Sequence, residues 1–353
     1  VVNGPIPYAP DGLPLIGQMP GVPNAFEACV FTFGIVQAGG AGKLLSEIIV
    51  EGESETDSWA VDPRRFTDHV THDYAKAKAI ETYSHEYAMH FPQIQWPAGR
   101  KAKTSPLYDT LAAAGAAFGS YGGWERADWF PRADEQAHPA DSYDRQHWFN
   151  AVGDECRHVA AHVGVLELTG FSRFLVKGPG AADWLRSLVT GGLPKVGRIG
   201  LVYFASEKGK ILTEMTATRL GEDEFLMMTG AGAYWHDRDL LNFRIPAGGS
   251  ISITDVTSQM ATLLVTGPKA PALMAGLTGQ AMGHDEFPWL TYRRMDIAGI
   301  GVTAIRVSFA GEAGWELHCD MEAIKALYDA VWAAGAAHEI GNFGMLALDS
   351  MRL

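Results

Sequence analysis

The chain combines short strand-like patterns with amphipathic helical patterns, and residues 163–189 show this most clearly. Their sequence, VGVLELTGFSRFLVKGPGAADWLRSLV, indicates two strands, a Gly-Pro turn and a helix. The segment that begins at Ile251, ISITDVTSQMATLLVTGPKAPALMAGL, repeats this order with Gly267-Pro268 before its helix. Two copies of strand, turn and helix predict an internally duplicated α+β unit.

Other segments have equally regular patterns. Residues 211–218 alternate like a strand, and residues 25–31 are strand-like as well. We expect a helix to begin at the glycine-rich stretch from Gly39 and to continue through the apolar residues up to Ile49, and another helix over residues 74–87. The whole pattern predicts a multidomain protein of the α+β or α/β class.

The residue composition and local pattern change along the chain and predict three regions. Residues 1–55 mix turn signals with one strand and one helix, whereas residues 56–110 are rich in charged, histidine and aromatic residues. Residues 111–353 contain the duplicated unit. We therefore expect a small linking domain between an N-terminal part and a large C-terminal domain.

Composition narrows the class of protein. With 353 residues, 47% of them hydrophobic, the chain can bury at least two cores. A net charge of −13 without a dense basic run disfavours nucleic acid as a partner. The three cysteines have neither CxxC spacing nor the pattern of a disulfide framework, which favours a reducing compartment. No apolar stretch approaches the roughly 18 to 20 residues of a membrane span, so none is expected.

The segment over residues 303–317, TAIRVSFAGEAGWEL, has the most informative chemistry. A β-branched strand pattern leads directly into Gly311, Glu312, Gly314 and Glu316. Glycines let the backbone take positive φ or approach a ligand closely, and two carboxylates offer acceptors to a donor-rich ring such as a pterin. The alternative is a hairpin with solvated acids.

This segment resembles the RxSYxGExGWEL signature of the aminomethyltransferase (glycine-cleavage T-protein) domain in dimethylglycine and sarcosine dehydrogenases. Further matches follow in family order along nearly the whole chain: NGPIPYAPDGLPLIGQMPGV from Asn3, FGIVQAGGAGKLLSEIIVEGE from Phe33, DPRRF from Asp62, GWERADWF from Gly123 and GNFGMLALDSMRL from Gly341. The resemblance implies the end of an FAD domain over residues 1–55, the central linking domain over 56–110 and the folate domain over 111–353.

The resemblance also implies an FAD-contacting loop whose backbone lies against the flavin ring. That loop comprises Phe31, Thr32, Phe33, Gly34, Ile35 and Val36. The family's GFGYG is replaced by VFTFG, so two glycines have become Val30 and Thr32, which would be strained if positive φ is needed there. GxGxxG is absent, and the chain begins with Val1 and stops inside a predicted helix, so we expect a fragment whose FAD is bound mostly by an upstream part.

Four residues are implied for tetrahydrofolate. Glu214 takes the position of the family's catalytic carboxylate, which can stabilise a cationic one-carbon group or accept a proton; the alternative is a solvated strand acid. Glu316 is expected to accept hydrogen bonds from the pterin, in one pocket with Glu214. Phe309 replaces the usual Tyr, and Arg352 is retained although the family's preceding arginine is Leu348.

A metal site is not expected. His158 and His162 have the i, i+4 spacing of a zinc-binding pair, with Glu155 and Cys156 nearby, but a second pair of ligands is missing from the pattern. His85 and His90 miss the HExxH spacing by one residue, so we interpret them as surface histidines.

The resemblance predicts an FAD-dependent oxidoreductase that demethylates an N-methyl amino acid such as dimethylglycine or sarcosine and passes the one-carbon unit to tetrahydrofolate. Its partners would be the amine, folate and an electron acceptor, in the cytoplasm of a bacterium or in the mitochondrial matrix. A non-catalytic homologue, similar to the regulatory subunit of pyruvate dehydrogenase phosphatase, is one alternative. A stand-alone folate-dependent demethylase or aminomethyltransferase is another, which the flavin-domain resemblance before residue 55 disfavours.

Overall fold

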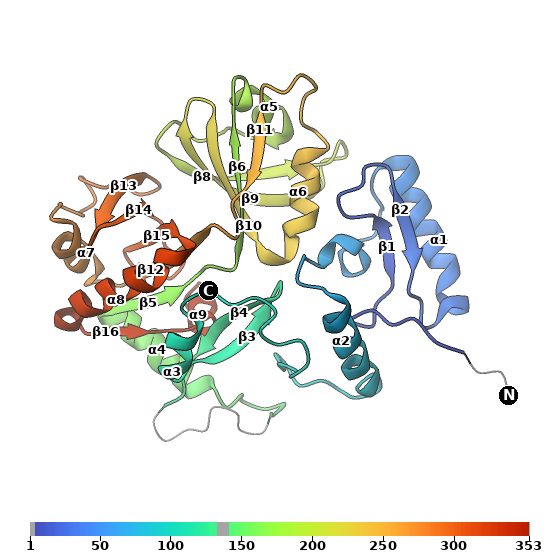
Figure 1. Ribbon diagram of the computed structural model, residues 1–353, viewed down its shortest axis with the longest axis horizontal. Helices are drawn as coiled ribbons and strands as arrows, with labels where there is room; N and C mark the ends of the chain where they lie inside the picture. Colours follow the sequence, from blue (N-terminus) through green and yellow to red (C-terminus); the bar gives the residue numbers. More distant parts are fainter. Residues whose placement is uncertain (1–3, 133–140, 353) are drawn as a thin grey trace.

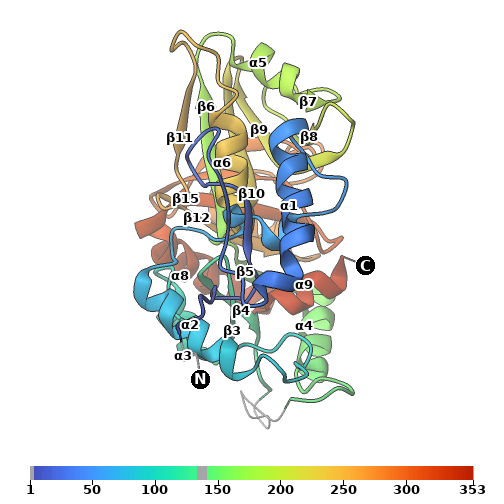
Figure 2. The ribbon, with the colours of Figure 1, turned by 90° about the vertical axis from the view of Figure 1, so that its right-hand side faces the viewer.

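The structure, a computed structural model, describes residues 4–132 and 141–352. Figure 1 shows two large sheets, one at the top and one at the left, with the N-terminal elements at the right. The side view in Figure 2 shows the N-terminal part in front of α6 (Tyr234–Asn242). The Gly21 N–H donates to Asp239 of α6 over 3.0 Å, and the Trp59 and His236 rings meet edge to face.

The N-terminal part consists of β1 (Leu15–Gln18), β2 (Phe26–Cys29) and α1 (Gly34–Glu51). The strand predicted over residues 25–31 is confirmed in shortened form by β2, which pairs antiparallel with β1. The expected helix start was wrong, because α1 begins at Gly34 and not at Gly39. The turn before the helix ends at Phe33, and the later glycines lie inside α1, where each is tolerated at a cost of about 1 kcal/mol.

The linking region is organised by capped helices. Two short 3₁₀ helices, η1 (Trp59–Val61) and η2 (Pro63–Arg65), precede α2 (His72–Ser84), which confirms the helix predicted over residues 74–87 with a shift toward the N-terminus. Thr71 caps α2 by accepting a hydrogen bond from the Tyr74 N–H over 3.2 Å. The chain continues into α3 (Tyr108–Ala113), the hairpin of β3 (Ala117–Tyr121) and β4 (Trp124–Trp129), and α4 (Phe149–Ala161).

The remaining strands form two six-stranded sheets. The first has the order β11 (Ser252–Asp255), β6 (Phe171–Lys177), β10 (Glu224–Gly230), β9 (Ile211–Gly221), β8 (Ile199–Ala205), β7 (Val189–Thr190). The second has the order β13 (Tyr292–Ile297), β14 (Ile300–Ile305), β15 (Gly314–Asp320), β12 (Met260–Thr266), β5 (Val163–Glu167), β16 (Ile340–Asn342). Their strands pair antiparallel except β16 with β5.

The remaining helices connect and cover these sheets. They are α5 (Ala181–Leu188), α6, α7 (Ala270–Thr278), α8 (Ile324–Gly335) and α9 (Met345–Met351), with the short η3 (Ala231–Ala233), η4 (Met321–Ala323) and η5 (Ala336–His338). Helices α5 and α6 pack with one face of the first sheet around Phe174 and Phe225. Helices α7 and α8 pack with one face of the second sheet around Trp315, and α4 and α9 pack with its other face around Leu264.

The predicted duplication is confirmed, and the two copies exchange strands. The first copy is β5, β6 and α5, and the second is β11, β12 and α7. In each copy the first strand pairs with the second strand of the other copy, so β5 lies beside β12 and β11 beside β6. The glycine of each Gly-Pro turn sits at this crossing: a Cβ on Gly178 would meet the Ser250 carbonyl oxygen at 2.0 Å, and one on Gly267 the His162 carbonyl oxygen at 2.2 Å.

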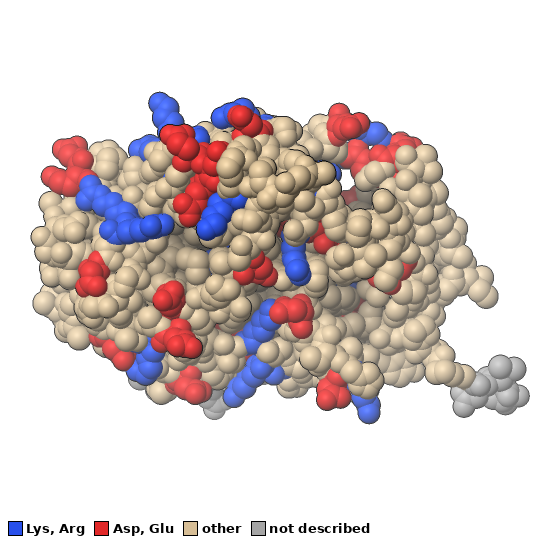
Figure 3. Space-filling model, turned by 45° about the horizontal axis from the view of Figure 1, so that its top comes forward, with Lys and Arg blue, Asp and Glu red and all other residues tan. Residues whose placement is uncertain are grey.

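The surface carries both signs of charge. Figure 3 shows acidic and basic side chains interspersed over the face that it presents. In the part of the chain that the structure describes, no helix is both long and apolar enough to cross a membrane.

Candidate functional site

Glu316 lies in the middle of the second sheet, on β15 between β12 and β14. Its neighbours in sequence, Trp315 and Leu317, point into the core under α7 and α8, so alternation along the strand directs Glu316 to the opposite face. Across the sheet it is opposite Leu264 and Ile305. The residue is 7% exposed, so it is a buried acid and not the solvated hairpin acid of the alternative interpretation.

A chain of hydrogen bonds, which we call the Arg173 relay, reaches Glu316 from the first sheet. The relay comprises Arg173, Thr262, His318 and Glu316. Arg173 on β6 is fully buried and donates to Thr262 Oγ1 over 2.6 Å. Thr262 Oγ1 lies 2.9 Å from His318 Nδ1, and His318 Nε2 lies 3.2 Å from Glu316 Oε2.

The relay has a direction because a guanidinium can only donate. At the other end the ionised Glu316 carboxylate can only accept, so it needs a donor, and the Nδ1 of a neutral His318 ring then accepts from the Thr262 hydroxyl. His318 therefore carries its proton on Nε2 and donates it to the Glu316 carboxylate. Burial lowers the pKa of His318, although the bond to Glu316 opposes this, and a neutral ring suits the single proton that the relay assigns.

Arg173 is held in place by more than the relay. It also donates to the carbonyl oxygens of Thr169 and Phe171, over 2.9 and 2.8 Å. Burial lowers its pKa to about 10, and the charges of Glu316 and Glu167 oppose this effect, so the guanidinium stays charged at neutral pH. Within the described residues, no hydrogen bond uses Glu316 Oε1. One carboxylate oxygen is thus held by His318 and the other can accept from a ligand.

Glu214 has a different environment. It lies on β9 opposite Tyr203 and is exposed to solvent. Alternation places it on the same face as Thr216, which pairs with Met228, and Met228 pairs with Arg173. Strand spacing therefore puts the Glu214 Cα about 12 Å from the Arg173 Cα. Arg173 joins the faces that carry the two acids, but none of the described hydrogen bonds connects Glu214 with Glu316.

The other two folate residues lie close together. The Arg352 guanidinium carbon is 5.4 Å from the centre of the Phe309 ring, and both side chains are exposed. Leu348, which replaces an arginine of the family, is buried at 4% exposure against α4 and the second sheet. An apolar residue suits that position, because a charge there would have to be buried.

Four polar residues of this region were not predicted from the sequence: Arg173 and His318 of the relay, and Glu167 and Arg126. Glu167 and Arg126 line a small cavity of about 40 Å³ next to Phe171 and Gly230, much smaller than the roughly 300 Å³ of ordinary ligand pockets. Burial raises the pKa of Glu167, opposed by hydrogen bonds from Thr169 and Ser105. An acid inside the apolar run VGVLELTG was the signal that could have identified Glu167.

The flavin-loop residues lie at the start of α1. Val30 has a φ of 60°, a rare conformation for a β-branched residue, whereas Thr32 does not have positive φ. The expected strain therefore occurs at one of the two substituted glycines. Ile35 is 96% exposed and Val36 is 81% exposed, so the first turn of α1 presents apolar side chains and uncapped N–H groups to solvent.

The histidine pairs do not assemble a metal centre. The His158 and His162 rings lie 5.0 Å apart at the end of α4, and His162 Nδ1 is 3.3 Å from Glu339. Over residues 4–132 and 141–352 there is no group of three side chains that could hold a metal ion. His85 and His90 are exposed and pack against Trp96.

Comparison with known proteins identifies two domain types. Residues 107–353 match the GCVT N-terminal domain, and residues 51–105 match the FAD dependent oxidoreductase central domain. Mitochondrial dimethylglycine dehydrogenase of Mus musculus is 36% identical over all of this chain and 41% of its own length. The formaldehyde-forming 4-methylaminobutanoate oxidase of Paenarthrobacter nicotinovorans is 33% identical over 99% of this chain and 43% of its own.

A solved structure supports the same assignment. The glycine cleavage system aminomethyltransferase T of Bartonella henselae aligns with a TM-score of 0.58 and 25% identity, over 71% of this chain and 62% of its own. The chain thus spans about two fifths of the curated relatives it matches, 41% and 43% of their lengths.

Proposed function

Because the chain belongs to the GCVT N-terminal domain family, preceded by a central domain of FAD-dependent oxidoreductases, we propose that it is the one-carbon transfer part of an N-methyl amino acid dehydrogenase or oxidase. The whole protein would demethylate a dimethylglycine- or sarcosine-like amine and pass the one-carbon unit to tetrahydrofolate. Its domains would be residues 1–55 of an FAD domain, the central domain over 56–110 and the folate domain over 111–353.

The environment of the Glu316 side chain supports this proposal more than any other observation. Its carboxylate is buried, one oxygen is oriented by the Arg173 relay and the other is free to accept a hydrogen bond. A pterin ring presents several N–H donors in one plane, and a charged acceptor in a low-dielectric site binds such donors more strongly than a solvated acid. When bound, tetrahydrofolate supplies the nucleophilic nitrogen that takes up the one-carbon unit.

The other residues would then have separate roles. Glu214, exposed on the face that continues from Arg173, would stabilise positive charge on the incoming one-carbon group or accept its proton. Arg352, stacked on Phe309 at the surface, would contact the anionic tail of the folate. The cavity of about 40 Å³ beside Glu167 is too small for a pterin, so binding would require Phe171 or the Gly230 segment to move.

The flavin part of the proposal depends on the start of α1. Phe31, Thr32, Phe33, Gly34, Ile35 and Val36 form a solvent-facing turn and helix start, where uncapped N–H groups suit a polar edge of FAD. In a polypeptide where this chain follows a flavin-binding segment, dimethylglycine or sarcosine should bleach the bound FAD. An unchanged flavin spectrum with both amines would contradict the oxidoreductase proposal.

Titration with tetrahydrofolate tests the folate site directly on this chain. We expect saturable binding by isothermal calorimetry, weakened about tenfold or more by Glu316→Gln, because a charge-assisted hydrogen bond contributes 1.5 to 3 kcal/mol. Glu322→Gln on the short η4 is the matched control, because this glutamate has no described partner, and it should bind like the wild type. A folded chain that binds no tetrahydrofolate would favour the non-catalytic regulatory alternative.

A further inference from the structure

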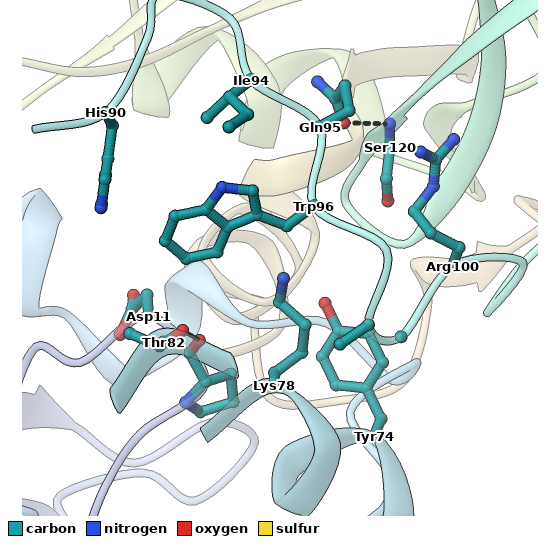
Figure 4. A pocket seen from close by; sticks show the side chains of 13 residues that line it. Asp11, Tyr74, Lys78, Thr82, His90, Ile94, Gln95, Trp96, Arg100 and Ser120 are labelled. Carbon is teal, nitrogen blue, oxygen red and sulfur yellow. Dashed lines mark hydrogen bonds between the residues drawn. The ribbon is translucent and has the colours of Figure 1, made fainter. Parts of the chain in front are cut away.

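A second cavity, of about 450 Å³, lies where four parts of the chain meet. Its walls are the turn at Pro10 and Asp11, one face of α2, the loop over residues 90–100 and Ser120 at the end of β3. It shares no lining residue with the folate-site candidates. Its volume falls in the range of small-molecule sites, and junctions between domains are common places for them (Figure 4).

The walls of this cavity are held by specific contacts. Tyr74, Lys78 and Thr82 follow at i, i+4 and i+8 on α2 and therefore share one face. Thr82 donates to the Pro10 carbonyl oxygen over 2.7 Å, which fixes the N-terminal turn to the helix. Gly99 has a φ of +69°, and a Cβ there would lie 2.5 Å from Tyr74 Cε2, so only glycine lets the loop approach this closely.

The acids around the cavity are already used by the protein. Both oxygens of Asp11 accept from Arg65, over 2.7 and 3.0 Å. Glu81 accepts from the Ala98 N–H over 2.7 Å with one oxygen and from Lys78 with the other. These carboxylates are therefore neutralised within the walls and leave little acceptor capacity for a ligand.

Two hydrogen-bond donors that line the same cavity are not fully used by the protein. The Lys78 ammonium has three N–H donors and uses one for Glu81. Within the described residues, no hydrogen bond uses the Tyr74 hydroxyl. Burial, with the charges of Glu81 and Asp11, raises the pKa of Tyr74, so this hydroxyl keeps its proton. Figure 4 shows the Lys78 amine and the Tyr74 hydroxyl pointing into the cavity beside the Trp96 ring.

An aromatic wall completes the arrangement. Trp96 is stacked on His85 and meets His90 edge to face, with ring centres 4.6 Å apart in both pairs, so two imidazole rings pack against its indole. Ile94 and Pro10 add apolar surface. A cation is disfavoured, because the Lys78 ammonium lies 5.5 Å from the centre of the Trp96 ring and would repel it. Arg100 also lines the cavity, but its guanidinium already donates to the Glu125 carboxylate and to the Phe118 carbonyl oxygen, so its charge is compensated.

We propose that this cavity binds a small carboxylate with a flat, apolar body, with the acid group at Lys78 and Tyr74 and the body against Trp96. The proposal does not depend on the function proposed for Glu316. Two sources share this chemistry: a free aromatic acid, and the aromatic acid portion of a folate.

Benzoate is the probe, and benzamide is its uncharged counterpart of the same shape. We expect ligand-observed NMR on the 353-residue chain to detect benzoate binding, with benzamide at least about tenfold weaker, since a charged hydrogen bond is lost. Lys78→Met should weaken benzoate about tenfold or more, and Tyr74→Phe about threefold. Lys76→Met is the control, because Lys76 is exposed on α2 outside the cavity, and it should bind benzoate like the wild type.

Two results would overturn the proposal: no benzoate binding by the wild-type chain, or equal binding by wild type and Lys78→Met. Circular dichroism melting of each variant shows whether it is folded. If Lys78→Met is not folded, Tyr74→Phe still tests the proposal. Competition then identifies the source of the acid. Displacement of benzoate by tetrahydrofolate in Glu316→Gln as well as in wild type supports a folate carboxylate in this cavity, and retention of benzoate supports a separate acid.

Discussion

The two six-stranded sheets contain equivalent strands of one duplicated unit, but they place their acids in opposite environments. The second sheet is covered on both faces, by α7 with α8 and by α4 with α9, and Glu316 is consequently buried. The first sheet packs on α5 and α6 with one face, while Glu214 on its other face is exposed. An acid on a strand of this fold is therefore solvated or buried depending on what covers that face of its sheet.

This difference in exposure affects the chemistry of the two acids, because burial decides how strongly a carboxylate interacts with nearby charges and hydrogen-bond donors. An exposed acid is screened by water, whereas a buried one needs partners that compensate its charge. Arg173 is that partner, and it belongs to the first sheet although it acts on an acid of the second. The exchange of strands between the two copies brings these residues together, so the following variants test that exchange first and the acid site last.

The largest effect is expected at the crossing of the two copies. Gly178→Ala and Gly267→Ala should each destabilise the chain by about 4 kcal/mol or more, because the new Cβ would overlap a carbonyl oxygen at a positive φ. Urea unfolding measures this. Gly276→Ala on α7, where nothing lies within 4 Å, is the control and should be neutral or stabilising. Similar stabilities for all three variants would refute the tight crossing.

The next effect concerns the junction between the sheets. Arg173→Met should lower the free energy of unfolding by about 3 to 4 kcal/mol, because it leaves buried carbonyl groups without a donor and the Glu316 charge without a compensating cation. Arg186→Met, which removes an exposed arginine of α5 paired with Asp183, should cost less than about 1 kcal/mol. Equal losses in the two variants, measured by urea unfolding, would show that burial gives Arg173 no special role.

The stability contributed by α4, which packs on the second sheet, should depend on pH through Glu155. This residue of α4 accepts from the N–H groups of Phe130 and Gly344, over 2.6 and 2.8 Å, and burial raises its pKa to about 7. The folded pKa lies above the unfolded one, so the contribution to stability is present below about pH 4.5 and is lost as pH rises through about 7. The expected loss is on the order of 3 kcal/mol.

Urea unfolding of wild type and Glu155→Gln across this pH range isolates the contribution. The difference between the two proteins should change with pH in the stated direction, whereas Asp154→Asn, at the exposed neighbouring position, should run parallel to the wild type. A pH-independent difference between wild type and Glu155→Gln would mean that Glu155 does not titrate in this range.

The smallest effect tests the direction of the relay. His318→Leu removes the donor to Glu316 Oε2 and should weaken tetrahydrofolate about tenfold, while His318→Gln, which can still donate, should recover part of the affinity. Calorimetry supplies the affinity, and urea unfolding separates it from stability. If both variants bind tetrahydrofolate as tightly as the wild type does, His318 does not position Glu316. If wild type does not bind, the folate proposal itself is wrong.

Local patterns identified much of the fold. The repeated strand, Gly-Pro turn and helix are present in both copies, and the strand predicted over residues 211–218 lies within β9. Helix α1 was placed too late because a glycine run usually marks a boundary, whereas here the preceding turn ends at Phe33 and the helix continues through the glycines. Glu167 was missed because a single acid in an apolar strand has no spacing pattern.

The amino-acid sequence by itself determined the order of the elements, the duplication and the resemblance to the aminomethyltransferase domain, because these depend on residues close together in the chain. Alternation also indicates which residues share a face of a strand, such as Glu316 and His318. Only the tertiary structure decided that β5 and β11 exchange partners, that Arg173 reaches Glu316, and that α2 and the loop over residues 90–100 enclose a cavity. Such contacts join residues far apart in sequence, and they form only when separate elements pack together.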